Sequence, residues 1–339
     1  MNQSAILLVN TGTPANTSVV AIARYLNQFL SDGRVITLPS LLRHMLVKQI
    51  IVPFRSFKSR NMYKQIWTEK GSPFLFHSLD FQQQLTKLAQ KKFDVYLGMR
   101  YGEPSLNKVV DKILDAQYKR LVVLPLYPQY ASSTAGSAIE LILKKLSSSD
   151  NIPDLQVVNS FYDHQAFIRP LTELIKYAKP QKYDHIFFSF HGLPVNHVYA
   201  SHKGYTCEEL NCSKEINDKN QYCYLAQCYA TVRSLVAQIP LDERHYSVGF
   251  QSRLSHNWIK PFSDKQIEKM GQNGIKKLLV VCPSFVADNL ETLMEVDIEY
   301  KELFLHNGGE EFSRVPSLNS NQNWVQGIYQ LTNNLPKLF

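Results

Sequence analysis

Short runs of β-forming residues alternate along the chain with longer stretches that have a helical period. Eight of these runs are predicted strands, at residues 5–10, 34–38, 93–99, 120–126, 155–160, 184–190, 246–250 and 277–282. Strands that alternate with helices build parallel sheets covered on both faces. The pattern therefore predicts an α/β fold with two halves of like architecture, each built on a four-stranded parallel sheet.

A polar cluster closed by proline, residues 147–153, separates the two periodic regions. We place the domain boundary there, with one domain over 1–150 and a second over 151–315. The chain of 339 residues is long enough for two domains, and its 44% hydrophobic and 19% charged residues are typical of a soluble globular protein.

Charge and the N-terminal pattern narrow the classes of function. The net charge of +8 favours anionic partners, which include nucleic acid, acidic lipid and small molecules with carboxylates. No stacking motif or recognition helix favours nucleic acid. The turn at 10–14 lacks the dinucleotide fingerprint and the P-loop pattern, so no nucleotide cofactor is expected. The apolar run 5–9 is too short for a signal peptide or a membrane span, which predicts a cytoplasmic protein.

A histidine and a glutamate follow two of the predicted strands. Residues past the carboxyl ends of parallel strands line the ligand crevice, so we expect His191 and Glu291 to face each other. Asp288 or Asn289 is the expected cap of the helix that carries Glu291, and the helix dipole favours an ionised carboxylate there. Glu295 lies on the same helical face. The alternatives are a structural histidine and a solvated acidic face.

Four of the five cysteines lie in one window, Cys207, Cys212, Cys223 and Cys228. Thiols gathered this closely in a cytosolic protein usually hold metal, and sulfur ligands suit either an iron-sulfur cluster or tetrahedral zinc. Free thiols and a redox disulfide remain alternatives. Cys282, inside an apolar strand, is expected to be a small buried hydrophobe.

Apolar and basic residues interleave over 38–67. That composition fits a lip, which we place at 38–76, that lies on anionic lipid and admits a flat apolar ring with carboxylates. A core helix with snorkelling lysines is the alternative.

The segments FFSFHGLP at 187–194 and ADNLETL at 287–293 resemble the signatures of ferrochelatase, and the likeness runs over nearly the whole chain. The resemblance implies two Rossmann-like domains, with the C-terminal helix (323–331) packed on the first. It implies that Fe²⁺ is inserted as a substrate into protoporphyrin IX in a cleft between the domains, giving haem. His191 would be the base or a transient iron ligand, and Glu291 and Glu295 would form an acidic path that also handles metal.

Further expectations come from the same resemblance. It implies peripheral contact of the lip with the inner surface of the membrane, for a monomer or a homodimer, and it favours a [2Fe-2S] cluster over structural zinc at the four cysteines. Many members carry histidine or cysteine where this chain has Asn289, so direct metal ligation is not expected there. The implied porphyrin contacts are Thr11, Arg55, Tyr63, Ser72, Arg100, Tyr101, Tyr130, Ser133, Ser137 and Trp258.

At several of these positions a purely structural role is the alternative. Arg100 equally fits a brace on a buried carboxylate, and Ser133 and Ser137 fit helix caps. Two other functions also remain open: a chelatase for the more carboxylated coproporphyrin, and a haem- or iron-sensing protein without catalysis.

Overall fold

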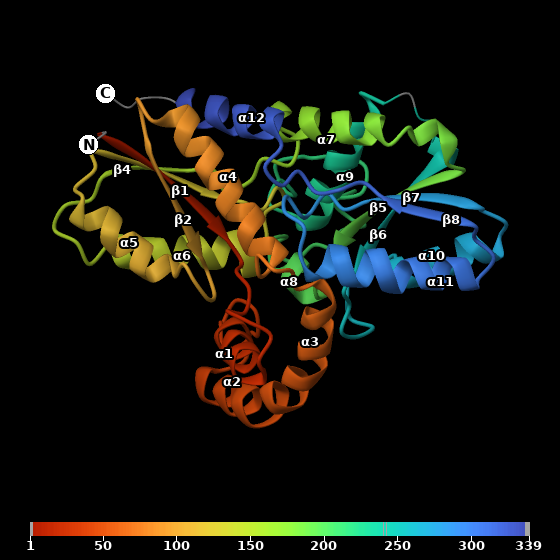
Figure 1. Ribbon diagram of the computed structural model, residues 1–339, viewed down its shortest axis with the longest axis horizontal. Helices are drawn as coiled ribbons and strands as arrows, with labels where there is room; N and C mark the ends of the chain where they lie inside the picture. The colour runs from red at the N-terminus through yellow and green to blue at the C-terminus, as the bar shows by residue number, and fades with distance from the viewer. Residues whose placement is uncertain (1–2, 240, 242, 336–339) are drawn as a thin grey trace. The chain divides into compact units, whose positions relative to one another are not determined.

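The structure is a computed structural model that describes residues 3–239, 241 and 243–335. The chain divides into two compact units. Unit 1 takes in the chain up to Tyr127, Ser132–Ser160 and the residues from Val325 onward, and unit 2 takes in Pro128–Ala131 and Phe161–Trp324. Figure 1 shows both units.

Unit 1 is built on a four-stranded parallel sheet with the order β2-β1-β3-β4. Helices α5 and α6 cover one face, where alternate residues of β1 meet their apolar sides, and α4 lies along the other face (Figure 1). The elements of this sheet and its cover are β1 (Ser4–Asn10), α4 (Pro73–Ala89), β2 (Asp94–Met99), α5 (Leu106–Asp115), β3 (Arg120–Pro125), α6 (Ser137–Leu146) and β4 (Asp154–Val157).

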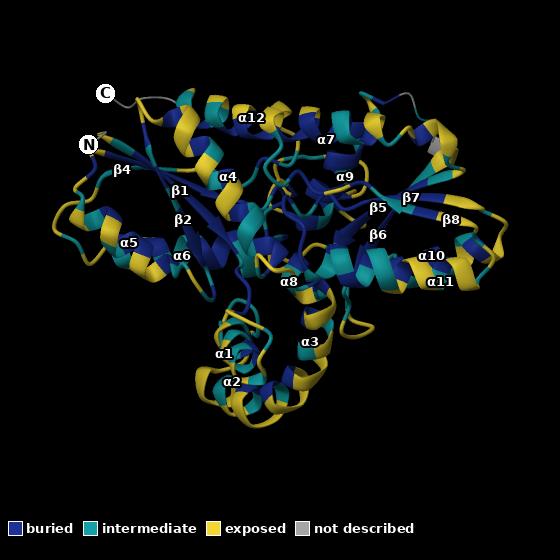
Figure 2. Ribbon diagram, in the orientation of Figure 1, coloured by how far each residue is buried: buried dark blue, intermediate teal, exposed yellow. Residues whose placement is uncertain are grey.

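Between β1 and α4 the chain forms a helical projection that we call the lip helices: α1 (Val19–Leu30), α2 (Ser40–Leu46), a π-helical turn (Val47–Ile51) and α3 (Val52–Ile66). Figure 2 shows that α2 and α3 are largely exposed, unlike the strands of the sheet. Of the segment 38–76, where the lip is predicted, residues 40–66 are helical.

Unit 2 repeats the architecture with the strand order β6-β5-β7-β8, again all parallel. Phe187 and Val280 of the sheet pack against Ile267 of α10 and Phe304 of α11, while α7 and α9 lie on the opposite side (Figure 1). Its elements are α7 (Gln165–Tyr177), β5 (His185–His191), α8 (Val195–Tyr199), α9 (Tyr224–Val236), β6 (Tyr246–Gln251), α10 (Ser263–Gln272), β7 (Lys277–Val281), a π-helix (Glu291–Tyr300), α11 (Lys301–His306), β8 (Glu311–Arg314) and α12 (Gln322–Asn333), which begins in unit 2.

The predicted fold class, two four-stranded parallel sheets flanked by helices, is confirmed, but two strand assignments were wrong. Residues 34–38 form a turn, because Asp32 accepts from the backbone of Arg34 at 2.8 Å and from Val35 at 3.1 Å. The short, mostly polar strand β8 was missed.

The boundary predicted at residue 150 also falls one strand too early. Strand β4 pairs with β3 and so completes the first sheet. The serine-rich cluster is only the loop between α6 and β4, since its hydroxyls bond to neighbouring backbone carbonyls.

Candidate active site

His191 and Glu291 lie at the same edge of the sheet in unit 2. His191 is the last residue of β5, which pairs directly with β7. After β7 the chain runs through a short loop to the π-helix that opens with Glu291. The two groups thus lie at the same edge of this sheet, and His191 lowers the pKa of the Glu291 carboxyl against the larger effect of burial.

The backbone of His191 is held by side chains. Its N–H donates to Ser284 Oγ at 3.3 Å, and its carbonyl accepts from the buried Tyr224 hydroxyl at 2.8 Å. Tyr224 Oη and Ser284 Oγ also lie 3.0 Å apart. The imidazole itself is half-buried, with Phe285 edge-on beside it at a centroid distance of 6.1 Å. These contacts fix the strand end through its backbone. Sequence reasoning missed Tyr224 and Ser284, which carry no motif of their own.

Asn289 caps the helix of Glu291. Its side-chain oxygen accepts from Thr292 N at 2.9 Å, and Thr292 Oγ1 accepts from Asn289 N at 2.9 Å, as in a capping box. Of the two predicted caps, Asn289 is thus the one observed.

Asp288 has a different role, as the centre of a buried ionic network. Arg314 donates from Nη1 to Asp288 Oδ1 at 2.8 Å and from Nε and Nη2 to the two oxygens of Asp297 at 2.8 Å each. Asn319 Nδ2 donates to Asp288 Oδ2 at 2.8 Å. Burial alone would raise the pKa of Asp288, but Arg314 and these hydrogen bonds hold it below its usual value. The network anchors the loop just before Glu291.

The Glu291 carboxyl is less easily ionised than the helix dipole alone predicts. Burial raises its pKa above the usual value, and the opposing effects of His191 and the local backbone N–H do not offset this. A carboxyl whose pKa is shifted by burial and by a specific charged neighbour marks a candidate functional site.

The Glu295 carboxylate is held in place by several hydrogen bonds. Its carboxylate accepts from Ser252 N at 2.7 Å, from Ser252 Oγ, from Gln251 Nε2 at 3.2 Å and from Tyr300 Oη at 2.8 Å. Ser252 takes a left-handed backbone conformation, with φ of 61°, at this point. Glu295 is therefore held in one position by these hydrogen bonds, while Glu291 lies beside His191.

In unit 1, three of the predicted porphyrin contacts surround one carboxylate. Asp32 Oδ2 accepts from Arg100 Nη2 at 2.6 Å, from Tyr101 Oη at 2.9 Å and from Ser137 Oγ at 2.5 Å. Although burial opposes it, these partners lower the pKa of Asp32. Arg100 thus braces a buried carboxylate, which was the alternative role considered for it. Asp32 was not identified from the sequence because a lone aspartate in a turn has no distinguishing spacing.

Two more of these residues lie near the turn after β1. Thr11 Oγ1 is 3.0 Å from Tyr127 Oη, and Ser72 Oγ is 2.9 Å from Thr13 Oγ1. Gly12 between them has φ of 103°, and a Cβ there would lie 1.7 Å from the carbonyl oxygen of Tyr101, so only glycine fits.

The lip and the π-helical turn before α6 carry three further predicted contacts. Tyr63 is buried and packs edge-on against Trp67 at a centroid distance of 6.2 Å. Arg55 is exposed on α3, and Ser133 is half-buried in the π-helical turn Ser132–Gly136.

Tyr130 and Trp258 belong to unit 2. The backbone N–H of Tyr130 donates to Gln227 Oε1 at 2.6 Å, and its ring meets Tyr222 at a centroid distance of 6.2 Å. Trp258 is half-buried and bridges to Pro194, close to the strand end at His191. A Cβ on Gly192 would lie 3.1 Å from the indole, so the glycine allows this close packing.

The cysteine window forms a group of four potential metal ligands, but they are not the four cysteines. His202, Cys207, Cys212 and Cys223 offer ligand atoms that all lie within 4.8 Å of one another. Cys228 is buried on α9 outside this group, and Cys282 is buried in the core of unit 2, as predicted. His202 was missed, although its place five residues before Cys207 was a readable signal.

The sequence relatives of the chain identify it as a metal chelatase, built here of two α/β units. The ferrochelatase family model matches residues 3–335. Named relatives include the ferrochelatase of Legionella pneumophila (strain Corby), 41% identical over 330 residues that cover 97% of this chain and 98% of the relative. The ferrochelatase of Coxiella burnetii (strain Dugway 5J108-111) is 39% identical over 341 residues, covering 100% and 95%. The chain belongs to the ferrochelatase family, which confirms the predicted function as a metal chelatase of haem biosynthesis.

Solved structures agree at the level of the fold. The structure of SirB from Bacillus subtilis with Fe³⁺ superimposes with a TM-score of 0.55 at 10% identity, covering 98% of this chain and 95% of the other. The sirohydrochlorin chelatase SirB from B. subtilis subspecies spizizenii in complex with cobalt gives a TM-score of 0.52 at 11% identity, covering 99% and 97%.

Proposed function

We propose that the protein inserts Fe²⁺ into protoporphyrin IX, with His191 and Glu291 as the groups that act at the centre of the ring. The observation that supports this most is their shared position: both stand at the carboxyl edge of the sheet in unit 2 and interact electrostatically. Family membership supports the reaction class, and the shared position of the two residues supports their proposed role.

The reaction exchanges two pyrrole N–H protons for one ferrous ion, so it needs groups that accept protons beside the ring. A base is most effective when its pKa lies near the working pH. The raised pKa of Glu291 moves the carboxyl in that direction. In this proposal Glu291 takes a proton as carboxylate, the imidazole of His191 takes a proton or holds the arriving ion, and the held carboxylate of Glu295 continues the path for protons or iron away from the ring.

The arginines among the proposed contacts favour one porphyrin substrate over the other. Two of the proposed contacts, Arg55 and Arg100, are cationic, and Arg100 already forms an ion pair with Asp32 at 2.6 Å. Arg55, exposed on α3, is thus the arginine available to a carboxylate. A ring with two propionates matches this supply better than coproporphyrin, which carries more. We propose that the polar groups of Thr11, Tyr63, Ser72, Tyr101, Tyr130, Ser133 and Ser137, and the indole of Trp258, complete the contacts.

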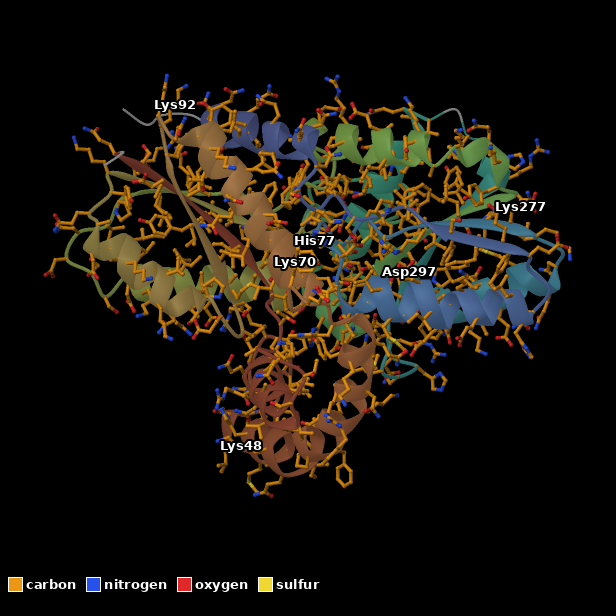
Figure 3. All side chains as sticks on the ribbon, in the orientation of Figure 1. Lys48, Lys70, His77, Lys92, Lys277 and Asp297 are labelled. Carbon is orange, nitrogen blue, oxygen red and sulfur yellow. The ribbon has the colours of Figure 1, made fainter. Side chains whose placement is uncertain are left out.

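We also propose that the lip helices touch the inner surface of the membrane from the cytoplasm. Large apolar side chains are exposed here, among them Phe54 at 77% and Leu41 at 74%. Basic residues lie among them, and Figure 3 shows Lys48 at the outer end of the projection. Such a surface binds anionic lipid through apolar burial and charge together. Among the described helices, none is long and apolar enough to cross a bilayer. Whether the protein acts as a monomer or a homodimer stays a prediction.

The test of the reaction is product analysis under anaerobic conditions, with Fe²⁺ and either protoporphyrin IX or coproporphyrin. We expect haem from protoporphyrin and little product from coproporphyrin. A sensing protein would bind either ring without turnover, and preferred metallation of coproporphyrin would overturn the proposed substrate. For the lip, co-sedimentation with anionic vesicles should fall sharply when Phe54 and Phe57 are changed together to Ser.

The sequence left an iron-sulfur cluster and a single zinc ion open at the cysteine window. The resemblance favours the cluster, whereas the ligand geometry favours the single ion.

A further inference from the structure

The loop between α8 and α9, residues 200–223, holds its ligand group without any helix or strand of its own. A loop of this length without regular structure needs another source of order. Yet its potential ligands are among its most buried residues, with His202 at 1% exposure, Cys207 at 7%, and Cys212 and Cys223 at 0%.

We infer that this loop binds one tetrahedral divalent ion, of the zinc type, through His202, Cys207, Cys212 and Cys223. Zinc–sulfur bonds of 2.3 Å and zinc–nitrogen bonds of 2.0–2.1 Å place tetrahedral ligands about 3.8 Å (S to S) and about 3.5 Å (S to N) apart. Here Cys207 Sγ and Cys223 Sγ are 3.9 Å apart, and Cys212 Sγ and His202 Nε2 are 3.7 Å apart. The inference goes beyond the proposed reaction and does not depend on it.

The histidine is oriented as a ligand. His202 Nδ1 lies 3.2 Å from the carbonyl oxygen of Tyr205, to which it donates its N–H. This bond fixes the tautomer in which the Nε2 lone pair faces Cys212. Metal-bound histidines almost always have such a partner for the second ring nitrogen.

Cys223 joins the ligand group to the helix that supports the active site. It is the N-cap of α9, and its sulfur accepts from Ala226 N at 3.4 Å. An ion on Cys223 would fix the start of α9, and the next residue, Tyr224, holds the carbonyl of His191 at 2.8 Å. The ion is thus placed to order the support of the active site.

The arrangement does not fit the [2Fe-2S] cluster expected on four cysteines. In such a cluster the irons are bridged by sulfides, so ligands on opposite irons lie further apart than ligands that share one ion. All four ligand atoms here lie within 4.8 Å of one another, and the fourth is a histidine. Cys228, further along α9, is instead fully buried beside the Tyr224 hydroxyl.

The test uses the full-length protein purified both anaerobically and in air, analysed for zinc, iron and acid-labile sulfide, and then loaded with Co²⁺. We expect one zinc per chain with no sulfide, and Co²⁺ spectra of a tetrahedral thiolate site. His202→Ala should weaken Zn²⁺ binding by at least roughly 10- to 100-fold. Cys228→Ser, the matched control, should bind Zn²⁺ as the parent does.

His202→Cys tests the same site even if His202→Ala does not fold. This variant should still bind one Co²⁺, with absorption shifted toward that of an all-sulfur site. Stoichiometric iron and sulfide in the parent protein would overturn the inference. So would loss of metal in Cys228→Ser with retention in His202→Ala, or failure of the parent protein to bind Zn²⁺.

Discussion

Replacing Arg314 by Met should test how much the buried ionic network stabilises the start of the Glu291 helix. Only 6% of the Arg314 side chain and 10% of the Asp288 side chain are exposed, whereas Asp297 is 36% exposed. The substitution leaves the Asp288 carboxylate buried without a cation. Breaking a buried ion pair from one side typically costs about 3–5 kcal/mol, and the more exposed bond to Asp297 adds at most about 1 kcal/mol.

The assay is equilibrium urea unfolding at neutral pH, read with probes in unit 2. Arg169→Met is the matched control, because the Arg169 side chain is 76% exposed in its pair with Glu173, and it should change stability by less than about 0.5 kcal/mol. Combining Arg314→Met with Asp288→Asn removes the unpaired charge and should recover much of the loss. A single variant that loses less than about 1 kcal/mol, or a double variant no better than the single, would refute this account of the network.

The remaining predictions concern pH and positioning. Because burial raises the pKa of Glu291, wild-type stability should fall as pH rises from 4.5 through the raised pKa. The urea midpoint, measured over this pH range, should no longer fall in this way in Glu291→Gln. Burial lowers the pKa of His185 to about 4, so stability should fall as pH drops from 6.5 to about 4, and less so in His185→Gln, which can still bond to Ser247. Tyr224→Phe frees the His191 carbonyl and should lower kcat about 5- to 10-fold, with porphyrin affinity, measured by fluorescence, unchanged.

Alternating apolar runs were sufficient to predict the two parallel sheets, since covered strands must be apolar. Strand prediction from these runs failed where local hydrogen bonds determine the backbone conformation. The β-forming residues after Asp32 form a turn because its side chain and carbonyl capture the following N–H groups. The edge strand β8 pairs with β7 although Glu311 and Arg314 are polar, because an edge strand is only partly covered.

At the site, position along the chain predicted the convergence of His191 and Glu291, because parallel strands place their carboxyl ends at one edge. Contacts between residues that are distant in sequence could not be predicted in the same way. Arg100 is held by Asp32, which is distant in sequence. His202 replaces Cys228 in the ligand group because loop geometry, and not residue type, decides which side chains meet.

The central claim is that His191 and Glu291 perform the metal insertion. Its most direct test is anaerobic Fe²⁺ insertion into protoporphyrin IX by His191→Ala and Glu291→Gln, with porphyrin binding measured by fluorescence in the same preparations. The exposed residues His306 and Glu299, changed to Ala and Gln, are the controls, and Glu299 shares the π-helix with Glu291. We expect both active-site variants to bind the ring and to lose at least roughly 100-fold in rate, as for removed acid-base groups, while the controls keep full activity. Near-normal turnover in either active-site variant would contradict the claim.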